Sequence, residues 1–131
     1  MSRVVHFEIQ ADDVERAKTF YASVFDWAFE DYSQFTGAAY WGVVTGPEDQ
    51  PGINGGLLPR PAPTPGEGQG TNAFVCTVGV VDYDDAERRI LDAGGRVALP
   101  KMALPGMAWQ GYYLDPEGNT FGIHQPDPEA A

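Results

Sequence analysis

The chain has 131 residues, a length at which one domain with a real hydrophobic core is expected. Hydrophobic residues make up 43% of the chain and charged residues 21%, which is typical of a globular protein and excludes a disordered one. The formal net charge of −11 argues against nucleic acids and membrane surfaces as partners, and it suits a neutral or cationic small-molecule ligand.

Cysteine content and hydropathy bear on the cellular compartment. Cys76 is the single cysteine, so no disulfide can form within the chain and a reducing compartment is expected. It lies in the apolar run Phe74-Val75-Cys76, which predicts a buried thiol. No charged leader precedes an apolar segment, and no apolar run approaches the roughly 20 residues of a membrane span. We therefore expect a cytoplasmic protein.

The first predicted element is a strand over residues 4–10, in which apolar side chains alternate with His6, Glu8 and Gln10. Because neighbouring side chains on a strand point to opposite faces, one face is apolar and the other carries these polar groups. A helix then runs to about residue 26, capped by Asp12 or Asp13 and apolar at helical spacing. Three further strands are predicted, at residues 27–32, 38–45 and 53–58.

Residues 59–70 are rich in proline and glycine and predict a linker, after which the same order begins again. The predicted elements are a strand at 72–80, a helix from Asp82 to Ala93, and strands at 96–99, 109–114 and 120–125. A tight turn at 115–119 separates the last two strands, and a polar tail follows from Pro126. Residues 100–107 predict a flexible connection that serves either as a lid or as a dimer contact.

The two helices match at a constant offset, which indicates an internal duplication. Val14 and Tyr83 differ by 69 positions, as do Ala17 and Ala86. The expected fold class is α+β: one domain over residues 1–131, built from units 1–58 and 71–126 with linker 59–70.

Three motifs, in this order and spacing, carry a resemblance to a known family. They are Val5-His6-Phe7-Glu8 with Phe20-Tyr21, then Ile53-Asn54-Gly55-Gly56-Leu57, then Asp115-Pro116-Glu117-Gly118-Asn119 with Phe121-Gly122. A doubled β-α-β-β-β chain with these motifs resembles the vicinal oxygen chelate superfamily of glyoxalase I, bleomycin-resistance proteins and extradiol dioxygenases. It is most similar to the uncharacterised bacterial glyoxalase-like branch.

The resemblance implies two curled mixed sheets around a cup with the helices outside, and a homodimer. It also implies four positions for metal ligands, of which His6 matches the first. The other three fall on Gly56, Val75 and Gly122, which have no ligating side chain. We therefore expect no metal or other cofactor of the glyoxalase type, because a divalent ion needs several side-chain donors.

The polar strand faces supply the candidate site residues. His6 and Glu8 are the candidate catalytic acid and base, and the alternative is that they only shape the lining or form a salt bridge. A second alternative is a divalent metal held by His6, Glu8 and His124. Aromatic residues, Tyr40 among them, are expected to divide between cup and core. The candidate substrate-binding residues are Gln10, Asn54, Val75, Thr77, Thr120, His124 and Trp109.

Two functions remain open at this point. The first is an enzyme, a lyase, isomerase or dioxygenase-like member of the superfamily, that acts by proton transfer on a small oxygenated organic substrate without the full metal site. The second is a non-catalytic protein that sequesters a drug or metabolite, as bleomycin-resistance proteins do.

Overall fold

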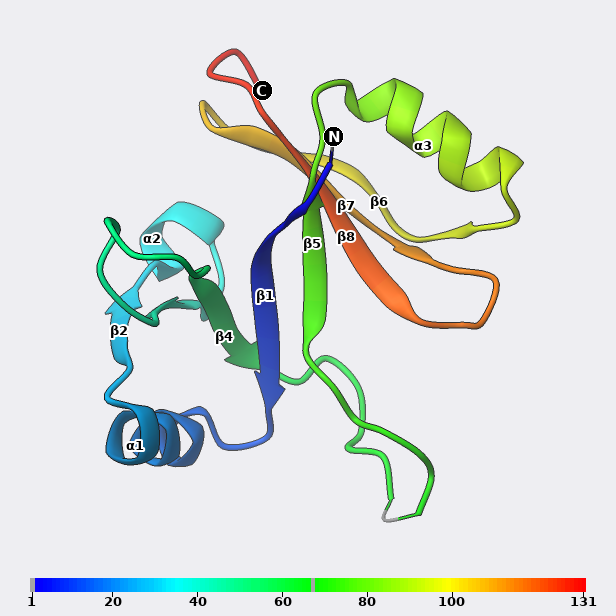
Figure 1. Ribbon diagram of the computed structural model, residues 1–131. Helices are drawn as coiled ribbons and strands as arrows, with labels where there is room; N and C mark the ends of the chain where they lie inside the picture. The colour runs from blue at the N-terminus through cyan, green and yellow to red at the C-terminus, as the bar shows by residue number, and fades with distance from the viewer. Residues whose placement is uncertain (1, 67) are drawn as a thin grey trace. The chain divides into compact units, whose positions relative to one another are not determined.

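The computed structural model describes residues 2–66 and 68–131, and Met1 and Glu67 lie outside the described part. The chain divides into two compact units. The first comprises His6–Phe74, and the second comprises Val75–Ala131 with the N-terminal residues through Val5. Each unit follows the order strand, helix, three strands, with one extra short helix in the first unit, so the α+β class and the doubled architecture are confirmed (Figure 1).

The first unit is a mixed sheet of four strands with the order β2-β3-β4-β1. β1 and β4 run parallel, while β2 and β3, and β3 and β4, run antiparallel. Its elements are β1 (Val4–Ala11), which belongs to this unit from His6 onward, α1 (Val14–Phe25), β2 (Ala28–Asp31), α2 (Ser33–Thr36), β3 (Trp41–Val44) and β4 (Gly55–Pro59).

Local chemistry sets the limits and the inner face of α1. The Asp13 side chain caps the helix by accepting from the Arg16 backbone N–H at 3.0 Å, and Asp26 ends it with a left-handed φ of 60°. The apolar side of β1 packs against α1 in a core that contains Phe7, Ile9, Val43 and Leu57 with Val14, Ala17 and Tyr21. Because side chains alternate along β1, His6 and Glu8 lie on the sheet face opposite α1.

The second unit repeats this arrangement with the strand order β5-β8-β7-β6. β5 and β8 run parallel, and the other pairs run antiparallel. Its elements are β5 (Val75–Gly79), α3 (Tyr83–Asp92), β6 (Arg96–Leu104), β7 (Ala108–Leu114) and β8 (Thr120–Pro126).

A pair of buried tyrosines joins α3 to the sheet of the second unit. Tyr83 and Tyr113 share a hydrogen bond of 2.8 Å between their hydroxyls, and Tyr113 also donates to Glu87. Burial raises the pKa of both phenols, so they stay protonated and able to donate. Ile123 completes the core beneath them.

The predicted flexible connection at residues 100–107 is wrong, because most of it belongs to β6. Met102 pairs with Gln110 and Leu104 pairs with Ala108, so the backbone here is held by the ladder of β7. Only the turn at Gly106, with a φ of 73°, separates the two strands.

Two smaller predictions also fail. The sequence predicted a polar tail from Pro126, but Pro126 still belongs to β8. Beyond it, the Ala130 carbonyl accepts from Gly106 N–H and Asp127 N–H donates to the Met107 carbonyl, each at 2.8 Å. Cys76 is exposed rather than buried. Described residues 60–66 and 68–74 hold neither helix nor strand, and Glu67 lies outside the described residues. Pro59, the first residue of the predicted linker, ends β4.

Candidate functional site

In the first unit, three side chains form a continuous hydrogen-bonded row on the sheet face opposite α1. His6 Nε2 lies 2.9 Å from the Tyr40 hydroxyl oxygen. The same hydroxyl donates to Glu8 Oε2 at 2.8 Å. Glu8 is buried, and His6 and Tyr40 are half-buried. A buried carboxylate that accepts from a phenol is a strong, charge-assisted contact.

The position of each proton in this row follows from the chemistry of the groups. Tyr40 has a single hydroxyl proton, and it points to Glu8 Oε2. The Tyr40 oxygen must then accept from His6, which places a proton on Nε2. His6 therefore takes part in the row as a donor through Nε2.

A glycine makes room for this row. Glu8 pairs with Gly56 across the parallel strands β1 and β4. A Cβ placed at Gly56 would overlap the Tyr40 hydroxyl, so any larger residue would push the ring away from Glu8 and His6. Gly56 is thus part of the site although it has no side chain.

The second unit contains a related row on the face opposite α3. The His124 Nδ1 atom lies 2.8 Å from Gln110 Oε1, and Gln110 Nε2 donates to Thr77 Oγ1 at 3.4 Å. Gln110 and Thr77 are buried, and burial lowers the pKa of the half-buried His124. A Cβ at Gly122 would lie 2.7 Å from Thr77 Oγ1 and 2.8 Å from Gln110 Nε2, so this row also depends on a glycine.

The two rows occupy matching places in the duplicated units. Thr77 pairs with Gly122 across β5 and β8, as Glu8 pairs with Gly56 across β1 and β4. Gln110 precedes by two residues the partner of Gly122 on β7, and Tyr40 precedes by two residues the partner of Gly56 on β3. Each unit therefore lays one long polar side chain over a glycine of its fourth strand.

The other predicted contact residues lie in several environments. Val75 is half-buried at the start of β5, and Thr120 is exposed at the start of β8. Trp109 packs with the α3-side core, where its Nε1–H donates to Asp127 at 3.0 Å. Because Trp109 precedes Gln110 on the strand, it lies on the opposite face from the row in this unit.

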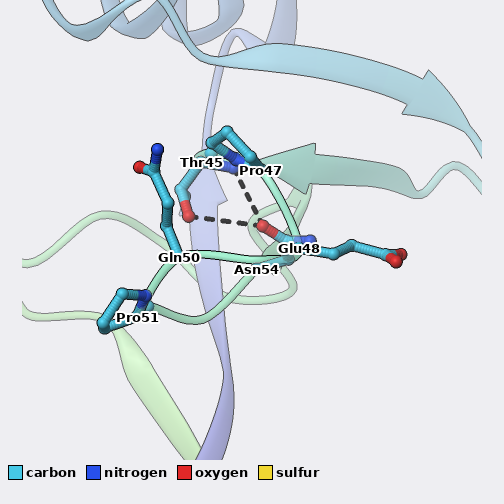
Figure 2. A pocket seen from close by; sticks show the side chains of 8 residues that line it. Thr45, Pro47, Glu48, Gln50, Pro51 and Asn54 are labelled. Carbon is cyan, nitrogen blue, oxygen red and sulfur yellow. Dashed lines mark hydrogen bonds between the residues drawn. The ribbon is translucent and has the colours of Figure 1, made fainter.

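Asn54 belongs to a shallow pocket of about 230 Å³ in the loop between β3 and β4. Its Oδ1 accepts from the Thr45 backbone N–H at 2.9 Å, and this bond joins the two ends of the loop. Figure 2 shows this bond and a second one, from the Thr45 hydroxyl to the same Oδ1 at 3.3 Å, with the Glu48 side chain directed away from them. The pocket is polar and open, and Asn54 acts there as a turn residue.

Gln10 lines a second pocket of about 210 Å³, together with Tyr21, Phe74 and Arg60. The Arg60 guanidinium donates to the Gln10 carbonyl at 3.0 Å and to Asn72 at 3.4 Å. Its Nε lies 3.4 Å from an Asp12 carboxylate oxygen, which is an ion-pair distance, and it makes no hydrogen bond within the described residues. These contacts tie the 60–74 segment to β1 and explain the position of Arg60.

The sequence named Tyr40 only as one of several aromatic residues and did not single out Gln110. Gln110 lies on β7, two residues before Tyr112, the partner of Gly122. Tyr40 lies just before β3, two residues before Gly42, the partner of Gly56, and the register of such strands cannot be read locally. The glycines at positions 56 and 122 were the available signal, because a glycine inside a strand often marks the close approach of another group.

Among residues 2–66 and 68–131, no group of three or more His, Cys, Asp or Glu side chains is placed to hold a metal ion.

Comparison with known proteins agrees with this architecture. The chain is similar to "Putative glyoxylase CFP32" of Mycobacterium tuberculosis, with 27% identity over 120 residues, which are 90% of this chain and 43% of that protein. The chain thus spans less than half the length of the curated relatives it matches. No helix of the described residues is long and apolar enough to cross a membrane.

Solved structures share the fold. A glyoxalase/bleomycin resistance protein/dioxygenase superfamily member from Vibrio splendidus 12B01 superimposes with a TM-score of 0.64 at 16% identity, over 95% of this chain and 99% of that one. Methylmalonyl-CoA epimerase from Mycobacterium tuberculosis superimposes with a TM-score of 0.62 at 16% identity, over 95% and 88%. The model of the Glyoxalase/Bleomycin resistance protein/Dioxygenase superfamily matches residues 3–123, and the chain belongs to that superfamily.

Proposed function

We propose that the chain is an enzyme that moves a proton at a carbon next to a carbonyl group in a small oxygenated molecule, with His6 as the base. The observation that carries this proposal is the unbroken row from His6 through Tyr40 to the buried carboxylate of Glu8. An imidazole can take a proton at one ring nitrogen while the other donates a hydrogen bond, so a histidine in such a row is suited to general base catalysis.

The row gives each of its members a role. The imidazole of His6 removes the proton from carbon, and the positive charge that forms is shared over the ring, including Nε2–H. Tyr40 accepts from Nε2–H while it donates to Glu8, so the carboxylate stabilises the imidazolium through the phenol. Return of the proton from His6 to the other face of the same carbon, or to the neighbouring carbon, completes the reaction, and no other reactant is consumed. Glu8 is a positioning and charge-stabilising residue in this scheme.

The ligand positions that the superfamily uses for metal do not fit a metal centre in this chain. A Cβ at Gly56 would overlap Tyr40, and a Cβ at Gly122 would crowd Gln110 and Thr77. Two of the four positions are thus covered by neighbouring side chains, and Val75 has no donor atom. We therefore derive no step through a metal ion.

The names of similar proteins support this class of chemistry. Epimerisation at a carbon next to a carbonyl proceeds by loss and return of a proton, and one of the structures that share the fold is named methylmalonyl-CoA epimerase. A curated relative is named as a glyoxylase. We accordingly place the substrate among α-ketoaldehydes, α-hydroxyketones and acyl thioesters.

The test begins with a thermal-shift screen of these three classes, and of cationic antibiotics, against the purified full chain. Compounds that raise the melting temperature are then incubated with the protein in deuterium oxide, and exchange of the proton next to the carbonyl is followed by NMR. We expect exchange in the wild type, a loss of about 10² to 10⁴-fold in His6→Gln, and a smaller loss in Tyr40→Phe and Glu8→Gln.

Tyr32→Phe is the matched control, because it removes another phenol that donates to a carboxylate, Glu30, at 2.8 Å in the same unit. Its exchange rate should equal that of the wild type. Exchange that persists in His6→Gln would remove the catalytic assignment. A compound that stabilises the protein and is recovered unchanged and undeuterated would instead support the non-catalytic alternative, sequestration of a ligand.

A further inference from the structure

The row in the second unit has a chemical consequence of its own, independent of proton transfer at His6. It contains Thr77, Gln110 and His124, three groups without a carboxylate or an ammonium among them. Gln110 is 7% exposed and Thr77 is 1% exposed, so water has little access to the side-chain amide of Gln110. Buried polar groups that satisfy one another in this way hold a single arrangement.

The orientation of the Gln110 amide determines which nitrogen of His124 carries the hydrogen. Its Nε2 donates to Thr77 Oγ1, so its Oε1 is the atom that faces His124 Nδ1. A carbonyl oxygen can only accept, and Nδ1 must therefore be the protonated nitrogen. This is the tautomer that free imidazole side chains disfavour in water, so it persists here only because Gln110 selects it.

The Nδ1–H tautomer leaves a lone pair on Nε2. Nε2 makes no hydrogen bond to any other residue within the described ranges 2–66 and 68–131. A neutral imidazole nitrogen with a lone pair accepts one hydrogen bond. Burial of a cation without a paired charge is costly, and the row itself offers no carboxylate, so this nitrogen suits a neutral donor better than an ammonium group.

We infer that His124 is a ligand-binding residue whose Nε2 accepts a hydrogen bond from a neutral hydroxyl group of a small molecule, and that Gln110 positions it. Thr77 fixes Gln110, and Gly122 provides the space in which the Gln110 amide reaches Thr77. The ligand class is a compound with a free hydroxyl, such as an α-hydroxyketone.

The tautomer is tested first, by nitrogen NMR of the full chain labelled at histidine. The chain has only two histidines, so the His6→Gln variant assigns the remaining signals to His124. We expect a protonated Nδ1 and an unprotonated Nε2 in the wild type at neutral pH. Gln110→Met, which has a similar shape and no carbonyl, should shift the population toward Nε2–H, whereas Gln110→Glu should retain Nδ1–H.

Gln34→Met on the exposed surface of α2 is the control, and it should leave the His124 signals unchanged. A wild-type His124 protonated at Nε2 would overturn the inference, because Gln110 would then be donating to the ring. If Gln110→Met fails to fold, the wild-type and Gln110→Glu spectra still decide the tautomer.

Ligand recognition is tested with a matched pair of probes, hydroxyacetone and methoxyacetone. In methoxyacetone a methyl group replaces the hydroxyl hydrogen, so it cannot donate a hydrogen bond. Hydroxyacetone should shift the Nε2 signal of His124 in the wild type, and methoxyacetone at the same concentration should not. Equal shifts from the two probes, or no shift from either, would overturn the assignment of a hydroxyl site. The readout requires no turnover, so it stands apart from the deuterium exchange that tests His6.

Discussion

Replacement of Gly56 by alanine tests whether the row in the first unit depends on the space above this glycine. The added Cβ would overlap the Tyr40 hydroxyl and would lie 2.7 Å from its Cε1 atom, so the ring must move away from Glu8. Loss of a hydrogen bond to a charged group costs about 1.5–3 kcal/mol. Alanine also reduces the entropy of the unfolded chain, which returns about 0.4–1 kcal/mol. The expected net destabilisation is about 0.5–2.5 kcal/mol.

The free energy of unfolding is measured by urea titration, followed through tryptophan fluorescence. Gly46→Ala is the matched control, because a Cβ there meets nothing within 4 Å, and it should be neutral or slightly stabilising. In a Tyr40→Ala background the overlap is gone, so the cost of Gly56→Ala should disappear. The reasoning is refuted if Gly56→Ala is as stable as Gly46→Ala, or if its cost is unchanged in the Tyr40→Ala background.

Two further predictions follow from other parts of the molecule. Burial lowers the pKa of His124 in the folded protein. Below about pH 6.5, His124 therefore binds a proton more readily in the unfolded chain than in the folded protein. Stability should therefore fall as the pH is lowered from about 8 to about 5.5, and His124→Gln should flatten this slope in urea titrations at both pH values. A slope that is unchanged in His124→Gln would contradict the assignment. Because Met102 and Leu104 lie in the β6–β7 ladder, hydrogen exchange should protect residues 102–104 far more than residues 62–66, and equal rates would restore the flexible connection predicted from the sequence.

Much of the fold could be predicted because the signals are local. Alternation along residues 4–10 predicted a strand with His6 and Glu8 on one face, and both helices begin at an aspartate cap as expected. The offset of 69 positions between the helices predicted the duplication, since each unit must bury the same apolar helix face against its own sheet. The shared placement of His6 and His124 around one cup, the homodimer and the cytoplasmic location stay predictions.

The sequence alone thus determined the elements, their order and the polar faces, because hydrophobic period and capping act between near neighbours. Only the tertiary structure decided which groups meet on those faces. The Tyr40 side chain contacts Glu8, and the Gln110 side chain contacts Thr77, in each case from a distant part of the chain. Each contact passes over a glycine, whose lack of a side chain leaves the space. Strand pairing between distant segments sets those distances, and it also extends β6 to Leu104 against a local pattern that indicated a loop.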